Sequence, residues 1–389
     1  MVKEKISIKT GPPVEGRDFY GRKKDLQYAW KTHIEKGTSL LLSAPRRVGK
    51  SSFSKKMLEI ARDNGWKTLY LDVEGISTES AFVNLFKTEL QSEKTWANSR
   101  ESIKKIFESI EGIEFGGVKI DLSVWRNNTY GEIKHLIANT EENILIVIDE
   151  LTIYLNHLLT PQKSDEGREK VEFFLEWLRS FRQTTKARWI LCSSIGIENF
   201  ASLNQLSKHL NDFHAFPIGA FSEDEAKDFI SRLDVDEKVQ FSREHIQYIL
   251  DKLVWHLPFF IQILVEKINF LIYVEGKQLS EGLIDEAYNR LITESYFNTW
   301  DERLKEYNEF EYNARRILRQ CALADGESRE VLLAGVTVKK NVDEIDKIDT
   351  VLSRLLSMLQ NDGYLLECEG KYIFRSPLLR DFWRVRFTK

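Results

Sequence analysis

One short segment has the residue types and spacing that suit phosphate binding. Residues 44–52 read Ala-Pro-Arg-Arg-Val-Gly-Lys-Ser-Ser, between the apolar run 40–42 and a helix-like segment at 53–61. A strand, a tight loop and a helix N-terminus in this order let backbone N–H groups and the helix dipole converge on a β-phosphate. Lys50 would then reach the β- and γ-phosphates as a catalytic group, and the Ser51 hydroxyl would ligate Mg²⁺.

One position departs from the phosphate-loop pattern G-x-x-x-x-G-K-[ST]. Ala44 stands where the first Gly is expected, and alanine resists a positive φ. A chance Gly-Lys-Ser at a helix start is the alternative, but the flanking strand and helix favour a true loop. We therefore assign the whole loop to nucleotide binding, namely Ala44, Pro45, Arg46, Arg47, Val48, Gly49, Lys50, Ser51 and Ser52.

A second motif, the acidic pair Asp149-Glu150, follows the run Ile-Leu-Ile-Val-Ile at 144–148. Five apolar residues, mostly β-branched, indicate a strand buried on both faces of a parallel sheet. Open α/β sheets bind ligands at the carboxyl ends of their strands. Asp149 would hold the Mg²⁺ shell, and Glu150 would polarise the water that attacks the γ-phosphate. A solvated acidic turn is the alternative, which the phosphate loop disfavours.

Two weaker signals complete the candidate site. Ser193 and Ser194 close a further strand pattern, where a hydroxyl would sense the γ-phosphate or orient the attacking water; serines at strand ends are also common in turns. Tyr20 and Gly21 lie just before the first strand and suit a lip around an adenine. A helix start with Tyr20 packed in the core is the alternative, and spacing alone does not separate the two.

The elements that must position these residues alternate between strand and helix. Strand patterns at 39–43, 67–73, 144–149 and 189–193 are separated by helical patterns, which predicts an α/β fold with a parallel sheet covered on both faces. A long insertion at about 75–140 carries helical stretches and one hairpin signal, Gly-Gly flanked by alternating residues at 113–122. We expect a contact surface or self-pairing there, without chemistry. The first fifteen residues are expected to form a loose arm.

From Ser222 onward the pattern is helical. Ser222 and Glu225 form a capping-box pattern, and further helices are predicted at about 244–253, 259–274 and 280–293. His256 is expected to cap a helix or pack in the core. From about Glu309, three helical segments precede a hairpin signal at 364–374, which is a winged-helix pattern. Its exposed helix face has little basic character, and residues 329–389 carry 11 Lys and Arg against 9 Asp and Glu.

Composition limits the classes of protein that are possible. A length of 389 residues predicts two or three domains, and three cysteines without metal-like spacing imply no disulfide framework. No apolar run approaches a membrane span and no leader pattern opens the chain, so we expect a cytoplasmic protein without membrane contact. A net charge of −4 implies no global attraction to nucleic acid, although a local patch is compatible with it.

With these motifs the chain resembles the archaeal-type ATPases of the STAND class of P-loop NTPases, within the AAA+-like group. Phe19-Tyr20-Gly21-Arg22 is similar to that family's N-terminal Gly-Arg box, 45–52 to its phosphate loop, Asp149-Glu150 to its acidic motif, Ser193-Ser194 to its sensor, and 374–383 to its C-terminal signature. His256-Leu257-Pro258 is similar to its lid motif Gly-x-Pro without the Gly. The resemblance implies that Tyr20, Gly21, Arg22 and Pro258 approach the nucleotide.

The resemblance also implies an architecture and a mode of action. We expect a P-loop ATPase core at 1–220, a helical lid at 221–305 and a winged-helix domain at 306–389. ATP and Mg²⁺ would drive a slow molecular switch that acts through a protein partner or self-association. An ATP-dependent DNA-binding protein of initiator or transposition-adaptor type is the alternative. No arginine finger can be assigned, because Arg182 and Arg188, which precede the sensor strand, are expected to be solvated.

Overall fold

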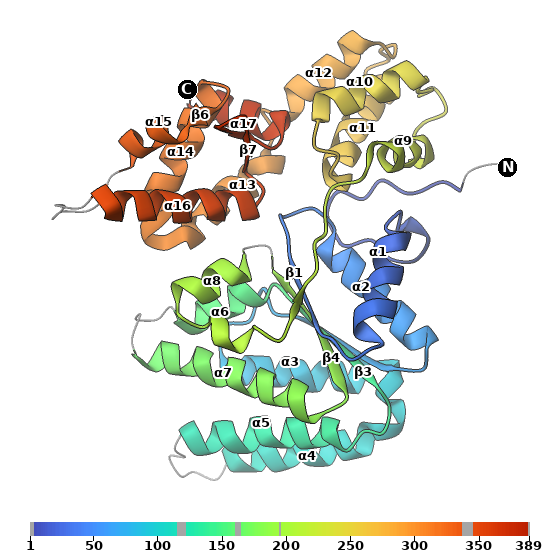
Figure 1. The fold of residues 1–389 in the computed structure, drawn as a ribbon. Coiled ribbons are helices and arrows are strands. Elements are labelled where there is room, and N and C mark those ends of the chain that lie inside the picture. Colours follow the sequence, from blue (N-terminus) through green and yellow to red (C-terminus); the bar gives the residue numbers. More distant parts are fainter. Residues whose placement is uncertain (1–3, 115–121, 160–164, 194–195, 337–344, 388–389) are drawn as a thin grey trace. The chain divides into compact units, whose positions relative to one another are not determined.

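The computed structural model describes residues 4–114, 122–159, 165–193, 196–336 and 345–387 (Figure 1). Contacts divide the chain into two compact units. We call residues 22–43 and 50–218 the sheet unit, and residues 1–21, 44–49 and 219–389 the helical unit.

The sheet unit is built on a five-stranded parallel sheet with the strand order β2-β3-β4-β1-β5 (Figure 1). Its strands are β1 (Leu40–Ser43), β2 (Lys67–Asp72), β3 (Ile144–Asp149), β4 (Ala187–Ser193) and β5 (His214–Ala215). The predicted α/β fold with a parallel sheet is therefore confirmed. The sequence analysis does not predict β5, because its two exposed residues carry no strand pattern.

Because of the strand register, the strands that precede the phosphate loop and the acidic pair, and the strand that ends in Ser193, all end at one edge of the sheet. Every residue of β3 is buried, as its apolar run predicts for a central strand. β4 lies between β3 and β1, with Ile148 opposite Leu191 and Ser43 opposite Ser193. The end of β1, which leads into the phosphate loop, is therefore next to the end of β4, and β4 is next to the strand that ends in Asp149.

Helices cover both faces of this sheet. α2 packs on one face, and α3, α6 and α7 pack on the other, where aromatic side chains fill the core (Figure 1). α4 and α5 form an outer layer against α3 and α7. The helices of this unit are α1 (Lys23–Tyr28), η2 (Ala29–Ile34), α2 (Lys50–Asp63), α3 (Glu79–Ser92), η3 (Lys94–Ser99), α4 (Arg100–Glu114), α5 (Leu122–Ala138), α6 (Leu151–Leu159), α7 (Asp165–Thr184), α8 (Ile197–Leu203) and η4 (Ser207–His209).

The hairpin predicted at 113–122 is not formed at its ends. α4 continues to Glu114 and α5 begins at Leu122, and residues 115–121 lie outside the described part of the chain. The helical spacing of Ile103 and Phe107, both buried, extends α4 past the start of the alternating pattern. An apolar period of 3.6 residues with a buried face thus outweighs a short run of alternating residues.

The first part of the helical unit contains the predicted helices as α9 (Glu223–Arg232), α10 (Arg243–Leu253), α11 (Pro258–Tyr273) and α12 (Glu281–Leu291). The Ser222–Glu225 capping box opens α9 as expected. The N-terminal segment is not a loose arm: Ile6 bridges Leu233 in parallel, and its backbone exchanges hydrogen bonds with Arg232 and Asp234 at 2.8 Å each. Pairing with the chain after α9 satisfies backbone groups that the isolated segment cannot satisfy.

The remainder of the helical unit carries a small antiparallel sheet of order β6-β8-β7. The predicted hairpin is β7 and β8, and β6 is a third strand of two residues that the sequence pattern does not indicate. The elements are η1 (Gly16–Asp18) near the N-terminus and then η5 (Ser295–Phe297), α13 (Asn298–Arg303), η6 (Leu304–Phe310), α14 (Glu311–Leu323), β6 (Glu327–Ser328), α15 (Arg329–Gly335), α16 (Ile345–Asn361), β7 (Leu365–Cys368), β8 (Lys371–Phe374) and α17 (Pro377–Phe387).

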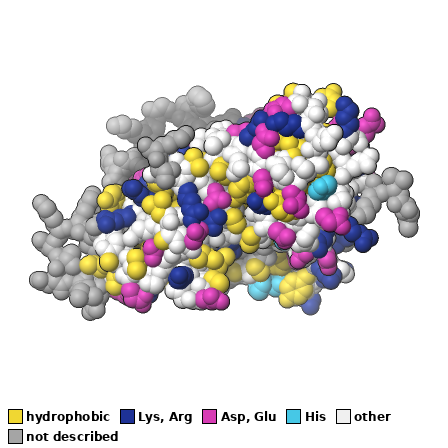
Figure 2. All heavy atoms as spheres, turned by 90° about the horizontal axis from the view of Figure 1, so that it is seen from above, with side chains coloured by type: hydrophobic (Ala, Val, Ile, Leu, Met, Phe, Trp, Pro, Cys, Tyr) yellow, Lys and Arg dark blue, Asp and Glu magenta, His cyan; other side chains and the backbone are white. Residues whose placement is uncertain are grey.

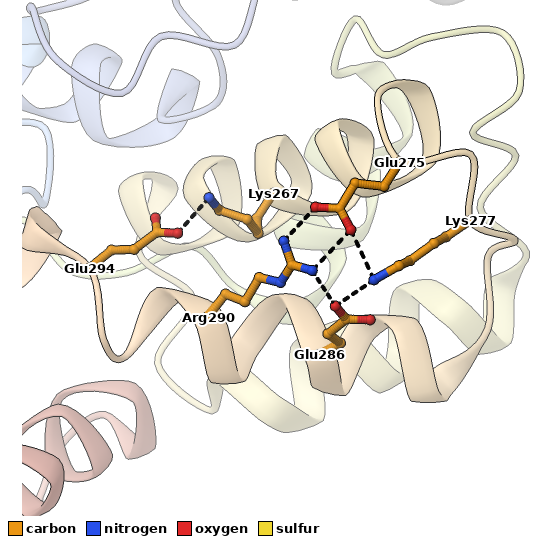
Figure 3. Close-up of polar contacts among 6 residues, drawn as sticks. All are labelled: Lys267, Glu275, Lys277, Glu286, Arg290 and Glu294. Atoms are coloured by element: carbon orange, nitrogen blue, oxygen red, sulfur yellow. Dashed lines mark hydrogen bonds and ion pairs between the residues drawn. The ribbon is translucent and has the colours of Figure 1, made fainter.

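An ion-pair cluster joins α12 to the turn after α11 (Figure 3). Arg290 contacts Glu275 and Glu286, and Lys277 contacts the same two carboxylates at 2.9 and 2.6 Å. Lys267 pairs separately with Glu294 at 2.7 Å. Charges that share partners hold the turn more firmly than an isolated surface pair would.

Two further expectations concern the chain as a whole. Cys192, Cys321 and Cys368 are free thiols, in agreement with the absence of a predicted disulfide framework. Of the helices in the described ranges, none has the length and apolar character needed to cross a membrane.

Candidate nucleotide site

The phosphate loop has the backbone shape that its sequence predicts, with one difference. Arg47 and Gly49 adopt left-handed φ values of 65° and 99°, whereas Ala44 does not adopt a positive φ. A Cβ added at Gly49 would meet nothing within 4 Å, so the left-handed backbone, and not a lack of space, explains the glycine there. Alanine in place of the first Gly is therefore compatible with this loop.

The residues that follow the loop open helix α2. Lys50 is the first residue of α2 and is buried, with 6% of its surface exposed, and Ser51 and Ser52 are half-buried. The N–H groups of a helix's first turn have no intrahelical partners and favour an anion. The start of α2 thus combines a buried ammonium, two hydroxyls and the positive end of a helix dipole.

Asp149 ends β3 and is held by hydrogen bonds from several elements. The Tyr70 hydroxyl, from β2, donates to Oδ2 at 2.7 Å, and the Glu150 N–H donates to Oδ1 at 3.1 Å. Burial raises the pKa of Asp149 above its ordinary value, and hydrogen bonds from Ser51 and Tyr70 oppose that rise. The Ser51 hydroxyl at the start of α2 is thus close enough to the carboxylate at the end of β3 to influence its pKa.

Tyr70 is a site residue that the sequence analysis does not identify. Burial raises the pKa of Tyr70, so its hydroxyl stays protonated and donates to the carboxylate. Tyr70 lies opposite Val147 in the β2–β3 register, and Asp72 lies opposite Asp149. Because side chains two residues apart share a face, Tyr70 and Asp149 point to the same side of the sheet. That relationship appears only once the register is known.

Glu150 occupies the turn between β3 and α6 in a strained backbone conformation. Its φ is 58°, in the left-handed region, which costs a non-glycine residue about 1 kcal/mol. The Glu150 carbonyl accepts from the N–H of Ile153 in the first turn of α6, and the Glu150 side chain is half-buried. Such strain is often found at functional sites, where it fixes the direction of a side chain.

Of the two predicted sensor residues, Ser193 is described and Ser194 lies outside the described residues. Ser193 ends β4, is completely buried, and shares a short hydrogen bond with the hydroxyl of Thr152, the second residue of α6. The preceding Cys192 thiol contacts the hydroxyl of Ser54 on α2 at 3.0 Å. Thr152 carries no sequence signal of its own, because its partner is 41 residues away.

The predicted adenine-lip residues lie in defined surroundings. In the helical unit, the Tyr20 hydroxyl donates to Asp228 at 2.6 Å, and its ring stacks on Phe229 with centroids 5.1 Å apart. Gly21 has a φ of 73°, and Arg22, in the sheet unit, is buried and precedes α1 with a φ of 56°. Tyr20 is thus packed, which is the second of the two interpretations; adenine contact stays a prediction.

Pro258 is the first residue of α11, where its missing N–H costs nothing. The next residue, Phe259, lies under the guanidinium of Arg47 at 4.6 Å from the ring centroid, within the helical unit. Arg47 also donates to the carbonyl of Gly11 at 3.1 Å.

His256 contacts the carbonyl of Leu250 near the end of α10, as expected for a capping histidine.

The two arginines before the sensor strand are not solvated as expected. Arg182 has a side chain that is 5% exposed, pairs with Asp212 at 2.6 Å and lies over the ring of Phe213. Arg188 is partly buried, and burial lowers its pKa. Both side chains are held within the sheet unit: Arg182 lies against the segment from His209 to Phe213, and the guanidinium of Arg188 lies beside Gly37.

Solved structures with a similar fold support the assignment of the architecture. The Walker-type ATPase PABY2304 of Pyrococcus abyssi matches with a TM-score of 0.62 and 16% identity, over 97% of this chain and 99% of that one. The Aeropyrum pernix ORC2 protein, in ADPNP–ADP complexes, matches with a TM-score of 0.54 and 13% identity, over 97% and 96%. No protein-family model and no curated protein sequence matches. The fold is therefore that of AAA+-like P-loop NTPases.

Proposed function

We propose that this chain is an ATP-binding, Mg²⁺-dependent P-loop ATPase. The observation that carries the proposal is the arrangement within the sheet unit of Lys50, Ser51, Asp149 and Glu150. The first two open α2 after a glycine-bearing loop, and the other two end the central strand β3. The β1–β4–β3 register and the lowering effect of Ser51 on the pKa of Asp149 indicate that the two motifs, almost a hundred residues apart in the sequence, lie at the same end of the sheet.

The donor set fits Mg²⁺. A carboxylate and a hydroxyl offer the hard oxygen atoms that this ion prefers, and Mg²⁺ usually takes one or two protein ligands together with phosphate oxygens and water. Ser51 and Asp149 would hold the ion, which would neutralise charge on the phosphates.

The remaining roles follow from the chemistry of each side chain. Lys50 would balance charge on the β- and γ-phosphates, and Glu150 would orient and polarise the attacking water. Ser193, at the end of β4, would sense the γ-phosphate. Turnover is expected to be slow, because no arginine finger is identified among the described residues.

We further propose that nucleotide state controls a switch of the STAND type, through a protein partner or self-association. In this proposal the chain comprises a core at 1–220, a lid at 221–305 that responds to nucleotide and a winged-helix domain at 306–389. Hydrolysis would release the lid and the winged helix from the core. A neighbouring copy that supplies an arginine would make assembly depend on ATP.

A DNA-binding protein of initiator type is the second candidate, favoured by fold similarity to the ORC2 protein along nearly the whole chain. Charge gives it little support. Lys and Arg are interspersed with Asp and Glu on the face seen in Figure 2. In the C-terminal part, arginines are paired with carboxylates in Arg329–Asp349, Arg380–Asp325, Arg384–Asp325 and Arg386–Asp301.

The first experiment measures binding of a fluorescent ATP analogue and release of phosphate, with Mg²⁺ and with EDTA. Lys50→Ala should weaken binding strongly, and Glu150→Gln should retain binding and stop hydrolysis. Lys56→Ala, in the same helix but paired with Glu59, and Glu141→Gln, before the other end of β3, are matched controls. Unchanged ATP binding by Lys50→Ala would refute the assignment of the phosphate loop.

The second experiment separates the two candidates by following mass in solution and hydrolysis, with and without duplex DNA. ATP-dependent assembly that DNA does not alter supports the protein-directed switch. Stimulation by DNA that is lost at high salt supports the initiator-type alternative, because phosphate contacts weaken steeply with salt.

A further inference from the structure

The Tyr70–Asp149 hydrogen bond is a contact between two neighbouring strands at the ligand-binding edge of the sheet. The tyrosine belongs to β2 and the carboxylate to β3, and the two side chains are on one face, offset by two residues. The bond is 2.7 Å long and ends on the carboxylate oxygen that the Glu150 N–H does not contact.

Two donors from different elements therefore hold one carboxylate: the Tyr70 hydroxyl on Oδ2 and the Glu150 N–H on Oδ1. A carboxylate oxygen has two lone pairs, so each oxygen of Asp149 can accept these bonds and still offer a lone pair to a cation. With donors on both oxygens the carboxylate cannot rotate freely. Its orientation is set before any ligand arrives.

Tyr70 is itself held in place. Its ring is half-buried beneath α2, where the Lys55 ammonium lies 5.0 Å from the ring centroid. Lys55 is one helical turn after Ser51, so these two residues lie on the same face of α2. The cation over the ring and the hydrogen bond at its hydroxyl together define where the hydroxyl lies.

We propose that Tyr70 is a positioning residue for the metal–nucleotide site and that it acts through Asp149. This inference rests on the proposed ATPase function. Groups that orient a metal-binding side chain commonly contribute 10- to 100-fold to metal affinity. Tyr70 should therefore support the metal-dependent part of nucleotide binding and leave the metal-independent part unchanged.

The test is Tyr70→Phe, which removes one oxygen atom and keeps the ring. We would measure two quantities. The first is the Kd of a fluorescent ATP analogue in EDTA. The second is the Mg²⁺ concentration at which half of the Mg²⁺-dependent decrease in that Kd is reached. Mn²⁺ binding in the presence of the nucleotide, followed by electron paramagnetic resonance, measures metal affinity without turnover. The variant should need about 10-fold more metal, with an unchanged Kd in EDTA.

Two controls make the result specific. Tyr288→Phe removes a similar tyrosine–aspartate bond, of 2.8 Å to Asp381 in the helical unit, and should leave the metal requirement unchanged. Thermal unfolding in EDTA identifies any variant whose melting temperature is lowered. Its Mn²⁺ binding is then measured below that temperature.

The outcomes separate this inference from the proposed function. If the parent binds Mg²⁺–ATP and Tyr70→Phe needs the same metal concentration, the positioning role is refuted while the ATPase proposal stands. A tighter metal site in Tyr70→Phe would refute it too, since the hydroxyl would then compete with the metal. If the parent shows no metal-dependent nucleotide binding, the proposed function fails and this inference fails with it.

Discussion

The hydroxyls of Thr152 and Ser193 share a hydrogen bond, and neither side chain is exposed to solvent. Thr152 is two residues after Glu150 at the start of α6, and Ser193 ends the strand next to β1. The bond thus ties the turn that carries the candidate catalytic carboxylate to the end of β4, the strand next to β1. A displacement of either segment strains the other, because buried hydroxyls cannot exchange this partner for water.

Thr152→Val keeps the shape of the side chain and removes the hydroxyl. The buried Ser193 hydroxyl loses this partner, so we expect stability to fall by about 1 kcal/mol. If the link sets the geometry of the Glu150 turn, kcat should fall while the Kd for ATP changes little. Chemical denaturation and steady-state hydrolysis measure the two effects separately.

Ser54→Ala is the matched comparison for that substitution. It also removes a buried hydroxyl that contacts β4, but its partner is the Cys192 thiol, a weak hydrogen-bonding group. Its effect on stability should be smaller than that of Thr152→Val, and kcat should be retained. Equal losses of kcat in both variants would show that the Thr152–Ser193 bond has no special role.

Asp149→Asn should separate stability from function. Burial raises the pKa of Asp149, which means that the folded protein bears a cost for its charge at neutral pH. An asparagine removes that charge and can still accept from Tyr70. We expect an equal or higher melting temperature in EDTA at pH 7, together with the loss of metal-dependent nucleotide binding. A clear fall in melting temperature would show that the hydrogen bonds to Asp149 already compensate for the burial of its charge in the absence of metal.

A buried ion pair links two helices of the insertion, α3 and α5. The Arg126 Nε on α5 donates to both oxygens of Glu79 on α3, at 2.8 and 2.9 Å, and both side chains are buried. Arg126→Met should destabilise the protein by about 3–5 kcal/mol, because it leaves a buried carboxylate without this partner.

The double substitution Arg126→Met with Glu79→Leu completes the cycle and should restore most of that loss, since well-packed apolar side chains often replace a buried pair at no cost. Denaturant unfolding of the four proteins gives the coupling free energy. Additive losses would indicate that packing, and not the pair, carries the effect.

The cluster in Figure 3 predicts a pH dependence. Hydrogen bonds from Arg290 and then Lys277 lower the pKa of Glu275 from 4.5 to about 2. A carboxylate with a lowered folded-state pKa stabilises the fold above pH 4.5, and this contribution is lost as the pH falls from 4.5 toward about 2.

Arg290→Gln should therefore melt below the parent at neutral pH, with a gap that narrows across this acid range. The groups are exposed, so the gap should be small and should shrink in 1 M salt. Melting curves at several pH values test this, and a gap independent of pH would contradict the assignment.

Local patterns allowed much of this molecule to be predicted. The parallel-strand segments, the helices from α9 to α12 and the β7–β8 hairpin follow from apolar periodicity, capping residues and turn residues that are close together in the sequence. The two ends of the hairpin predicted at 113–122 are helical, because a helical pattern on each side extended into them, and residues 115–121 lie outside the described part of the chain.

The chemistry of the candidate site could also be predicted from the sequence. A glycine-lysine-serine loop between strand and helix, and an acidic pair after an apolar strand, each act through groups that neighbour one another in the chain. Their assignment therefore needed no knowledge of which strands are adjacent.

Only the tertiary structure decided which distant groups meet. The Tyr70–Asp149 bond depends on the register of β2 against β3, the Thr152–Ser193 bond on the packing of α6 against β4, and the Ile6–Leu233 bridge on a pairing across more than two hundred residues. These contacts form because strand order and packing remove polar groups from water and require partners for them. A single sequence records the residue types at such positions but not which of them become neighbours.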